Sequence, residues 1–388
     1  VFEFSQSTLP DERERLLAES TADILRFLQL EADYSSPLLP FLGGGFAYDY
    51  LAAFEELPEV KPGANTYPDY EFLVAQTVLA VDHLQGTAHL EGWDIDDKGL
   101  REELDSLASL PAAARPAAPQ REKIRAVADV NDAGFRADVD KLKGNIHAGD
   151  IYQVVPARAF TVECPNALAA YRALRETNPS PYMFYVRGAA YELFGASPES
   201  NLKFTPEDRQ IQLYPIAGTR PRGLNPDGSI NHELDIRNEL DMRTDHKEIA
   251  EHTMLVDLAR NDLARVAVPR SRQVAELLHV DRYSRVMHLV SRVTATLHPD
   301  FDALDAYRAC MNMGTLTGAP KLRATELVRR TEGKRRGSYG GAVGYLRGDG
   351  AMDNCIVIRS AYVQDGTAVV QAGAGVVKDS MPQAEADE

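Results

Sequence analysis

Two pairs of glutamates stand three residues apart, a spacing that places both carboxylates of a pair on one face of a helix. The first pair is Glu248 and Glu251 in HKEIAEH, and the second is Glu385 and Glu388 in PQAEADE. If the two helices meet, the four carboxylates form an all-oxygen site for a hard divalent cation such as Mg²⁺. Two solvated acidic helix faces are the alternative, since charged pairs at this spacing are common on exposed helices.

Three other residues have the chemistry to hold an anion. Gly373 and Gly375 in QAGAGVV follow a predicted strand, and bare backbone N–H groups there can approach a carboxylate closely. A turn that needs positive φ explains the same glycines. Arg359 interrupts the apolar run CIVIRS, where a buried guanidinium requires an anionic partner. Exposure on an edge strand is the competing interpretation.

Glu199 and His288 have the chemistry to move protons. Glu199 lies in SPES after the apolar run LFGA, and burial there raises the pKa of a carboxyl towards that of a general acid. A carboxylate in an exposed turn is the simpler interpretation. His288 lies between Val286 and Val290 on one face of a predicted strand, so its imidazole points towards an apolar interior. A core histidine with satisfied hydrogen bonds is the alternative there.

The elements that carry these residues are grouped by type along the chain. A helix with Phe135, Val139 and Leu142 on one face and a helical region over residues 231–265 stand apart from runs of short strands with turn residues between them. A hairpin is predicted at Asp365-Gly366. This grouping predicts an α+β fold, a layered sandwich of large antiparallel sheets with helices outside.

Composition excludes several classes of partner. The net charge of −16 gives no general attraction to nucleic acid or to an anionic membrane, and no apolar run is long enough to cross one. The three cysteines form no ligand or disulfide pattern, so we expect a cytoplasmic protein. The Pro- and Ala-rich residues 110–120 predict a linker and divide the chain into residues 1–120 and 121–388.

From residue 130 onwards the chain resembles the chorismate-utilising enzymes, and within them the large subunits of anthranilate synthase of the enteric type. The resemblance rests on ordered motifs at family spacing, among them IYQVVPAR, NPSPYMF, LFGASPES, YPIAGTRPRG, RTDHKEIAEH, CMNMGTLTGAP, GSYGGAVGYL, CIVIRS and QAGAGVV. It implies that residues 121–388 are the chorismate-binding catalytic domain. It also implies that residues 1–120 are the remainder of the N-terminal region of such subunits.

The resemblance also implies roles for individual residues. The glutamates Glu248, Glu251, Glu385 and Glu388 match the family's magnesium ligands, and the ion anchors the ring carboxylate of chorismate. Glu199 matches the general acid that protonates the departing hydroxyl, and His288 matches the histidine of the later pyruvate elimination. The substrate-binding positions are Gly218, Thr219, Thr315, Tyr339, Arg359, Gly373 and Gly375.

Two positions favour ammonia as the nucleophile. Water-using relatives carry a lysine base at Gln153, and ammonia needs no base. Aminodeoxychorismate synthases carry a nucleophilic lysine at Ala217. The resemblance therefore implies the conversion of chorismate and ammonia to anthranilate and pyruvate, the first step of tryptophan biosynthesis, through an aminodeoxyisochorismate intermediate.

Regulation and partners follow from the same resemblance. A separate glutamine amidotransferase small subunit is expected to supply ammonia within a heterotetramer. Tryptophan feedback is implied by a partial site of Asn178, Pro179, Ser180, Tyr182 and Met183, although the family's Leu-Leu-Glu-Ser stretch does not occur in the sequence. Because the sequence stops at Glu388, we expect the last helical turn to fray and to hold that ligand poorly.

Two other functions compete with this one. A relative that stops at the aminated intermediate shares most of the motifs, and the fluorescence of anthranilate separates the two enzymes. A chorismate- or tryptophan-binding protein without turnover is the alternative from a different class. Calorimetry that shows binding without pyruvate release favours it.

Overall fold

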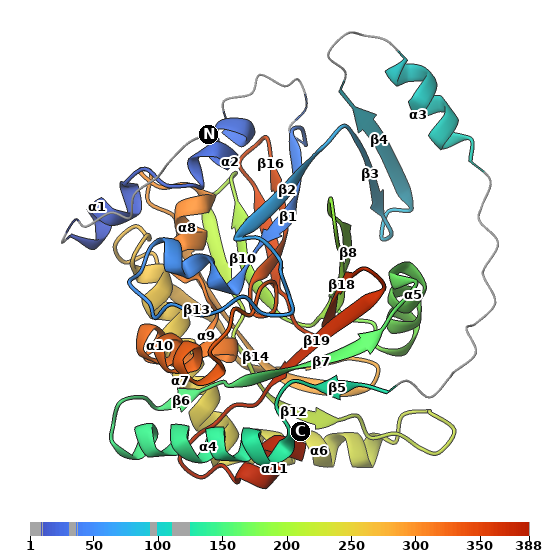
Figure 1. Cartoon of the computed structure of the whole chain (residues 1–388). Helices are drawn as coiled ribbons and strands as arrows, with labels where there is room; N and C mark the ends of the chain where they lie inside the picture. The colour runs from blue at the N-terminus through green and yellow to red at the C-terminus, as the bar shows by residue number, and fades with distance from the viewer. Residues whose placement is uncertain are drawn as a thin grey trace.

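Two antiparallel β-sheets form the centre of the molecule, and most of the helices lie around them (Figure 1). The computed structural model describes residues 9, 11–30, 36, 38–93, 99–110 and 125–387. The predicted α+β fold, with large antiparallel sheets and outer helices, is confirmed.

The larger sheet has nine strands and draws on both ends of the chain. A Cβ on Gly44 would lie 2.0 Å from the carbonyl oxygen of Glu71, so the GGGF run lets its strand lie close to its neighbour. The linker predicted at residues 110–120 falls, apart from Leu110, outside the described residues, and the division there stays a prediction. The strands in spatial order are β12 (Ile216–Pro221), β14 (Val286–Thr296), β11 (Gln210–Leu213), β10 (Ser200–Thr205), β17 (Met352–Ile356), β16 (Ala342–Arg347), β1 (Phe41–Phe46) and β2 (Tyr70–Ala75), and β13 (Gln273–Arg282) pairs with β14.

The smaller sheet has six strands and contains the predicted hairpin. Gln364 pairs with Thr367 across Asp365 and Gly366, which have φ of 50° and 73°, as a tight two-residue hairpin turn requires. Its strands in order are β5 (Val127–Ala128), β7 (Ala157–Glu163), β19 (Thr367–Gly373), β18 (Ser360–Gln364), β9 (Glu192–Ser197) and β8 (Tyr182–Arg187). Two short pairs complete the strands: β6 (Gln153–Val154) with β15 (Gly318–Ala319), and β3 (Thr77–Asp82) with β4 (Thr87–Gly92).

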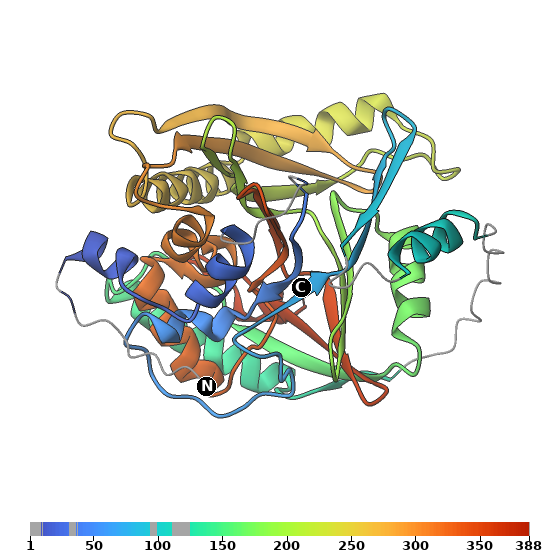
Figure 2. The same ribbon diagram turned by 90° about the horizontal axis from the view of Figure 1, so that it is seen from above.

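The helices pack on the sheets from several sides, as the view from above makes clear (Figure 2). They are α1 (Glu12–Leu17), α2 (Asp23–Leu30), η1 (Tyr48–Ala53), α3 (Leu100–Ala108), α4 (Asp132–His147), α5 (Ala167–Thr177), α6 (His232–Thr244), α7 (His246–Ala264), α8 (Ala303–Cys310), α9 (Gly314–Thr317), α10 (Lys321–Glu332) and α11 (Pro382–Asp387). Within the described ranges, no helix is both long and apolar enough to cross a membrane.

The helical region predicted over residues 231–265 consists of two helices, α6 and α7. Asp245 separates them, because its carboxylate accepts hydrogen bonds from the backbone N–H groups of Lys247 (2.9 Å) and Glu248 (3.2 Å). An aspartate in this position caps the N-terminus of the second helix. The cap fixes the first turn of α7, which carries Glu248.

The predicted apolar face of α4 is buried. Phe135, Val139 and Leu142 form a core cluster with side chains of α10 and with Ala386 of α11. Burial of these side chains stabilises the docking of α11 on α4. This packing places the last helix, with Glu385, beside the sheets.

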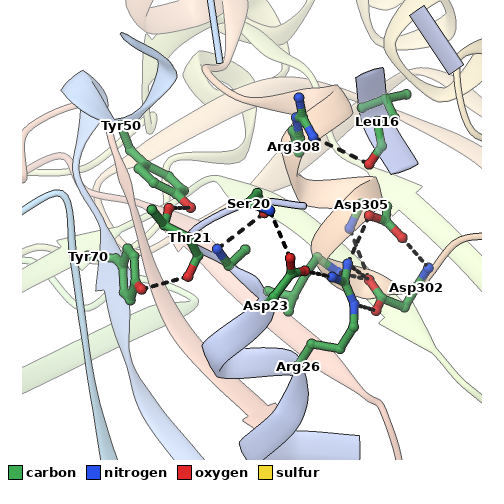
Figure 3. A network of polar contacts seen from close by, with 12 residues as sticks. Leu16, Ser20, Thr21, Asp23, Arg26, Tyr50, Tyr70, Asp302, Asp305 and Arg308 are labelled. Atoms are coloured by element: carbon green, nitrogen blue, oxygen red, sulfur yellow. Dashed lines mark hydrogen bonds and ion pairs between the residues drawn. The ribbon is translucent and has the colours of Figure 1, made fainter. Parts of the chain in front are cut away.

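A network of ion pairs fastens α2 to α8 (Figure 3). The guanidinium of Arg26 lies among the carboxylates of Asp23, Asp302 and Asp305, with an Nη2–Oδ1 distance of 2.9 Å to Asp305. Asp302 also caps α8, and burial together with the nearby charge of Asp302 raises the pKa of Asp305 to about 7. One cation therefore compensates three clustered carboxylates.

Replacing Arg26 by Met is expected to lower the free energy of unfolding by about 2–3 kcal/mol, because it leaves partly buried carboxylates without a cation. The matched control is Arg237→Met, which removes the exposed i,i+4 ion pair to Glu233 on α6 and should cost less than about 1 kcal/mol. Urea denaturation followed by circular dichroism measures both. Equal losses in the two variants would show that the network does not hold α2.

Candidate active site

The chain crosses from one sheet to the other at two neighbouring places, and a candidate site residue lies at each. Glu199 stands between β9 and β10, and Arg359 stands between β17 and β18. The N–H of Ile356 donates to the carbonyl of Glu199 (3.0 Å), and the N–H of Ala196 donates to that of Arg359 (3.1 Å). These bonds hold the two crossings side by side.

The apolar run CIVIRS does not form one continuous strand. The strand ends at Ile356, and Arg359 has a φ of 48°, which no regular strand allows. The physical reason is the change of sheet, since β17 pairs in the larger sheet and β18 in the smaller one. Arg359 is therefore placed by the crossing and not by the alternation of a strand.

Glu199 is buried, as the general-acid hypothesis requires. The residue is 4% exposed, and the hydroxyl of Thr315 on α9 donates to its Oε1 at 3.0 Å. Burial raises the pKa of its carboxyl to about 8, although the Thr315 bond, the N–H of Ile216 and the charge of Arg359 all act to lower it. The carboxyl is therefore mostly protonated at neutral pH.

Arg359 presents a positive charge to the same space. Arg359 is an exposed residue, and within the described part of the chain its guanidinium makes no hydrogen bond or ion pair. Its charge nevertheless contributes to lowering the pKa of both Glu199 and His288, which places it near the two groups. A cation in this state is available to an anionic ligand.

His288 lies on β14 with its imidazole buried. Its Nδ1 is 2.9 Å from the hydroxyl of Thr219 on β12, while Nε2 has no hydrogen-bond partner among the described residues. Burial, and secondly the charge of Arg359, lower the pKa of the imidazole to about 4. The ring is neutral, and a ring that donates from Nδ1 presents a bare Nε2. The alternative of a fully satisfied core histidine does not fit this arrangement.

Gly373 and Gly375 are required by close approach and not by backbone conformation, since neither has positive φ. A Cβ on Gly373 would lie 3.2 Å from the hydroxyl of Tyr339 and 2.9 Å from the carbonyl oxygen of Pro156. A Cβ on Gly375 would lie 3.1 Å from Nε2 of Gln153. The end of β19 thus passes directly over Tyr339 and Gln153.

Helices α7 and α11 bring acidic side chains together. Burial raises the pKa of Glu251, and the charges of Glu248 and Glu385 raise it further. The amide Nε2 of Gln153 donates to Glu251 Oε1 at 2.6 Å and has the opposite effect. Glu388 lies outside the described residues.

The carboxylates of Glu248, Glu251 and Glu385 are the type of ligand that binds a divalent cation, but their oxygen atoms do not converge on one point in the structure. Carboxylate oxygens are the ligands that Mg²⁺ prefers. In the part of the chain that the structure describes, no group of three or more acidic, histidine or cysteine side chains is arranged to hold an ion. Arg220 Nη1 donates to Glu248 Oε1 at 2.7 Å, and Gln153 holds Glu251.

Gly218 joins the acidic group to the proton-handling group. It has a φ of 97°, and a Cβ there would lie 3.4 Å from Oε2 of Glu248. The next residue, Thr219, holds His288. Gly218 and Thr219 therefore lie between His288 and Glu248 of α7, and the charge of Arg359 acts on both His288 and Glu199.

The residues expected to form part of a tryptophan-binding site lie between the end of α5 and the first residues of β8. Tyr182 and Met183 on β8 line a cavity of about 460 Å³ that also contacts β1, β16 and Cys355. Cys355 pairs with Ser200, next to Glu199. The other three residues, Asn178, Pro179 and Ser180, follow α5 and do not line this cavity.

Two arginines that the sequence did not single out take part in the site. Arg336 is 2% exposed, donates to the carbonyls of Leu316 (2.7 Å) and Val155 (2.6 Å), pairs with Glu332 and lies 5.7 Å from the ring of Tyr339. Its i,i+4 spacing from Glu332 was a signal for this pair. The second is Arg220, which pairs with Asp241, Asp245 and Glu248. The spacing of these three acidic residues along α6 and α7 was a signal that a cation lies beside them.

Comparison with known proteins places these features in a family. Residues 4–388 match the chorismate binding enzyme family. The chain is 55% identical to anthranilate synthase component 1 of Vibrio parahaemolyticus over 97% of its own length and 71% of that protein. It is 52% identical to the component 1 protein of Salmonella typhimurium, over 98% and 75% of the two chains.

A solved structure agrees with the fold. The crystal structure of anthranilate synthase component I from Streptococcus pneumoniae superimposes with a TM-score of 0.84 at 31% identity. The superposition covers 95% of this chain and 83% of that one.

Proposed function

Because the chain belongs to the chorismate-binding enzymes, and within them to the component 1 proteins of anthranilate synthase, we propose that the Glu199–His288 site carries both chemical steps of that enzyme. The activity is the conversion of chorismate to anthranilate in tryptophan biosynthesis. One observation supports the residue roles: a buried carboxyl with a pKa of about 8 and a neutral imidazole with a bare Nε2 both lie near one unpaired arginine.

The anionic groups of the substrate find positive or donor groups in this space. Arg359 and the hydroxyl of Tyr339 take the enolpyruvyl carboxylate, with the backbone at Gly373 and Gly375 against it. Gly218 and Thr219 line the same pocket, and Thr315 orients the carboxyl of Glu199. These contacts position the ring between the acid and the imidazole.

In the first step ammonia forms a bond to C2 of the ring while the bond from C4 to its hydroxyl breaks. The carboxyl of Glu199 gives its proton to the departing oxygen, which leaves as water. A carboxyl that stays protonated at neutral pH is suited to this role. The product is aminodeoxyisochorismate.

In the second step Nε2 of His288 accepts the proton from C2. The electron pair of the C2–H bond forms the new ring double bond while the bond from C3 to the enolpyruvyl oxygen breaks, and the ring becomes aromatic. The imidazolium returns the proton to the methylene carbon of the departing enolpyruvyl group, which leaves as pyruvate. A neutral imidazole is required for this step, and its low pKa ensures that form. Acid and base are thus separate residues with pKa values shifted in opposite directions.

Ammonia is the proposed nucleophile because no lysine stands at positions 153 and 217. Gln153 is buried and its Oε1 has no partner among the described side chains, so the amide oxygen is free to accept a hydrogen bond from ammonia. Ala217 cannot form a covalent adduct.

Magnesium is proposed at Glu248, Glu251 and Glu385, with Glu388 as a fourth ligand from beyond the described residues. When bound, the ion neutralises the ring carboxylate of chorismate and anchors it. Burial raises the pKa of Glu251, the charges of Glu248 and Glu385 raise it further, and this gathering of carboxylates supports a cation in this position.

The partners are proposed from the same family membership. The component 1 name implies a second component, and we propose a glutamine amidotransferase small subunit that supplies ammonia, in a heterotetramer. Tryptophan is proposed as a feedback ligand in the cavity beside Tyr182 and Met183. The three free cysteines fit the reducing cytoplasm as the proposed compartment.

Chorismate with ammonium and magnesium at alkaline pH is expected to give anthranilate, followed by its fluorescence, together with pyruvate in equal amount. Removal of magnesium with a chelator should abolish the activity, and added magnesium should restore it. Pyruvate without anthranilate, or an aminated product without pyruvate, would contradict the proposed function. Activity that survives the chelator would contradict the metal alone.

A further inference from the structure

We propose that Arg220 is a latch on the metal site: it pairs with Oε1 of Glu248, and a cation that takes this oxygen has to displace the guanidinium. This inference rests on the magnesium site proposed above. It assigns to Arg220 the role of lowering the affinity of that site for the ion.

The latch joins a strand to the helix pair that carries the glutamates. Arg220 on β12 donates through Nε to Asp241 (2.8 Å), through Nη2 to Asp245 (3.0 Å) and through Nη1 to Glu248 (2.7 Å). Its side chain is 21% exposed, so these bonds form in a partly desolvated setting where charge pairs are stronger than in water.

The three carboxylates differ in what they lose when Arg220 moves. Asp241 and Asp245 continue to neutralise the guanidinium after Nη1 has left Glu248, so the release leaves no bare arginine. Asp245 also keeps its bonds to the N–H groups of α7 and stays in place. For Glu248, the Arg220 bond is the one hydrogen bond that the structure gives its carboxylate among the described residues. It can therefore turn to an ion without breaking another contact.

A cation and Arg220 cannot both neutralise the same carboxylate at full strength. Glu248 and Glu251 lie three residues apart on α7, so their carboxylates share one face of the helix and together attract a cation. Arg220 supplies one positive charge to Glu248 from the strand side. An ion that enters has to displace this charge, and its net affinity falls by the cost of that exchange.

The latch is also connected to the proton-handling group. Arg220 Nη1 donates to the backbone carbonyl of Thr219 at 3.0 Å, and the hydroxyl of Thr219 holds Nδ1 of His288. The same guanidinium nitrogen thus contacts the metal ligand and the residue that orients the imidazole. Release of Glu248 leaves the bond to Thr219 available to fix that segment.

The test is calorimetric titration of Mg²⁺ into the whole chain without chorismate, so the readout is the Kd of the ion and not activity. Arg220→Gln is expected to lower the Kd about tenfold, because the competing charge is gone. Arg220→Lys keeps the charge with fewer donors and should lie between Arg220→Gln and the unmodified chain. Circular dichroism shows whether Arg220→Gln is folded. If it is not, the Kd of the Arg220→Lys variant provides the test.

The matched control is Lys247→Gln, which removes a positive charge near Glu251 but one on an exposed side chain without a hydrogen bond to Glu248. It should change the Kd by less than about threefold, as expected for an exposed charge. Equal effects of the Arg220→Gln and Lys247→Gln variants would overturn the latch, since general electrostatics would then explain both.

A further variant separates the latch from the site on which it rests. Glu251→Gln should abolish the binding of Mg²⁺ if the ion lies between α7 and α11. If Glu251→Gln binds the ion as tightly as the unmodified chain, the proposed metal site is wrong and the latch falls with it. If Glu251→Gln abolishes binding but Arg220→Gln leaves the Kd unchanged, only the latch is wrong.

Discussion

His288→Met is expected to stop the formation of anthranilate while chorismate is still aminated. The imidazole is the group assigned to the second step, and methionine fills a similar volume without accepting a proton. The rate of anthranilate formation should fall about 10²- to 10⁴-fold, the usual worth of a positioned base. The aminated intermediate should accumulate, and chromatography with mass spectrometry detects it.

The control for this variant is His279→Met on the neighbouring strand β13. The imidazole of His279 is exposed and lies beside Asp281, outside the proposed active site. Amination and elimination should therefore both proceed at the normal rate in this variant. If His288→Met forms anthranilate at the rate of the unmodified chain, His288 does not serve the elimination. If it neither aminates nor eliminates, the two steps do not have the separate residues described here.

Glu199→Gln is expected to stop the reaction one step earlier. Glutamine matches the carboxyl in size and can keep the bond from Thr315, but it has no acidic proton to give to the leaving hydroxyl. Loss of chorismate should slow about 10²- to 10⁴-fold, and no intermediate should accumulate. Glu192→Gln is the control, because Glu192 lies on the preceding strand β9 and its carboxylate bonds Tyr185 instead.

The pH dependence gives a second check on Glu199. Its carboxyl has a raised pKa of about 8, so the protonated form that the first step needs is present below that pH and is lost as the pH rises through it. At a constant concentration of free ammonia, the amination rate should therefore fall above about pH 8. Glu199→Gln should lack this decline. A decline that persists in the variant belongs to another group.

Local features of the sequence were sufficient for part of the fold. The apolar face of α4 follows from helical spacing, and the hairpin at Asp365-Gly366 follows from the conformations that these two residues favour. The strand around His288 follows from its run of apolar and β-branched residues, and it is buried on both faces, so the imidazole is buried with its neighbours. In each case neighbours within a few residues decide the structure.

Other features depend on contacts between distant segments. The break before Arg359 arises because the chain changes sheets, and nothing within CIVIRS marks that change. The placement of β1 beside β16 joins segments about three hundred residues apart, which periodicity does not encode. The pairing of Arg220 with Glu248 is likewise a contact between a strand and a helix that only the folded chain brings together.

The family motifs indicated the roles of the site residues, whereas the fold determined their surroundings. Spacing alone left Glu199 as a turn carboxylate and His288 as a core histidine, and the ordered family motifs raised both to catalytic candidates. The fold then supplied what motifs cannot, namely the burial that raises the pKa of Glu199 and the unpaired Nε2 of His288. Glu388 lies outside the described residues and keeps its role as a prediction.

We propose that one pocket carries two steps with separate residues, Glu199 for amination and His288 for elimination. The most direct test transfers the aminated intermediate, purified from His288→Met, to the Glu199→Gln variant with magnesium present. Glu199→Gln, although inactive on chorismate, is expected to convert this intermediate to anthranilate and pyruvate at nearly the rate of the unmodified chain. Failure of a folded Glu199→Gln variant to convert it, while the unmodified chain does, would contradict the division of roles.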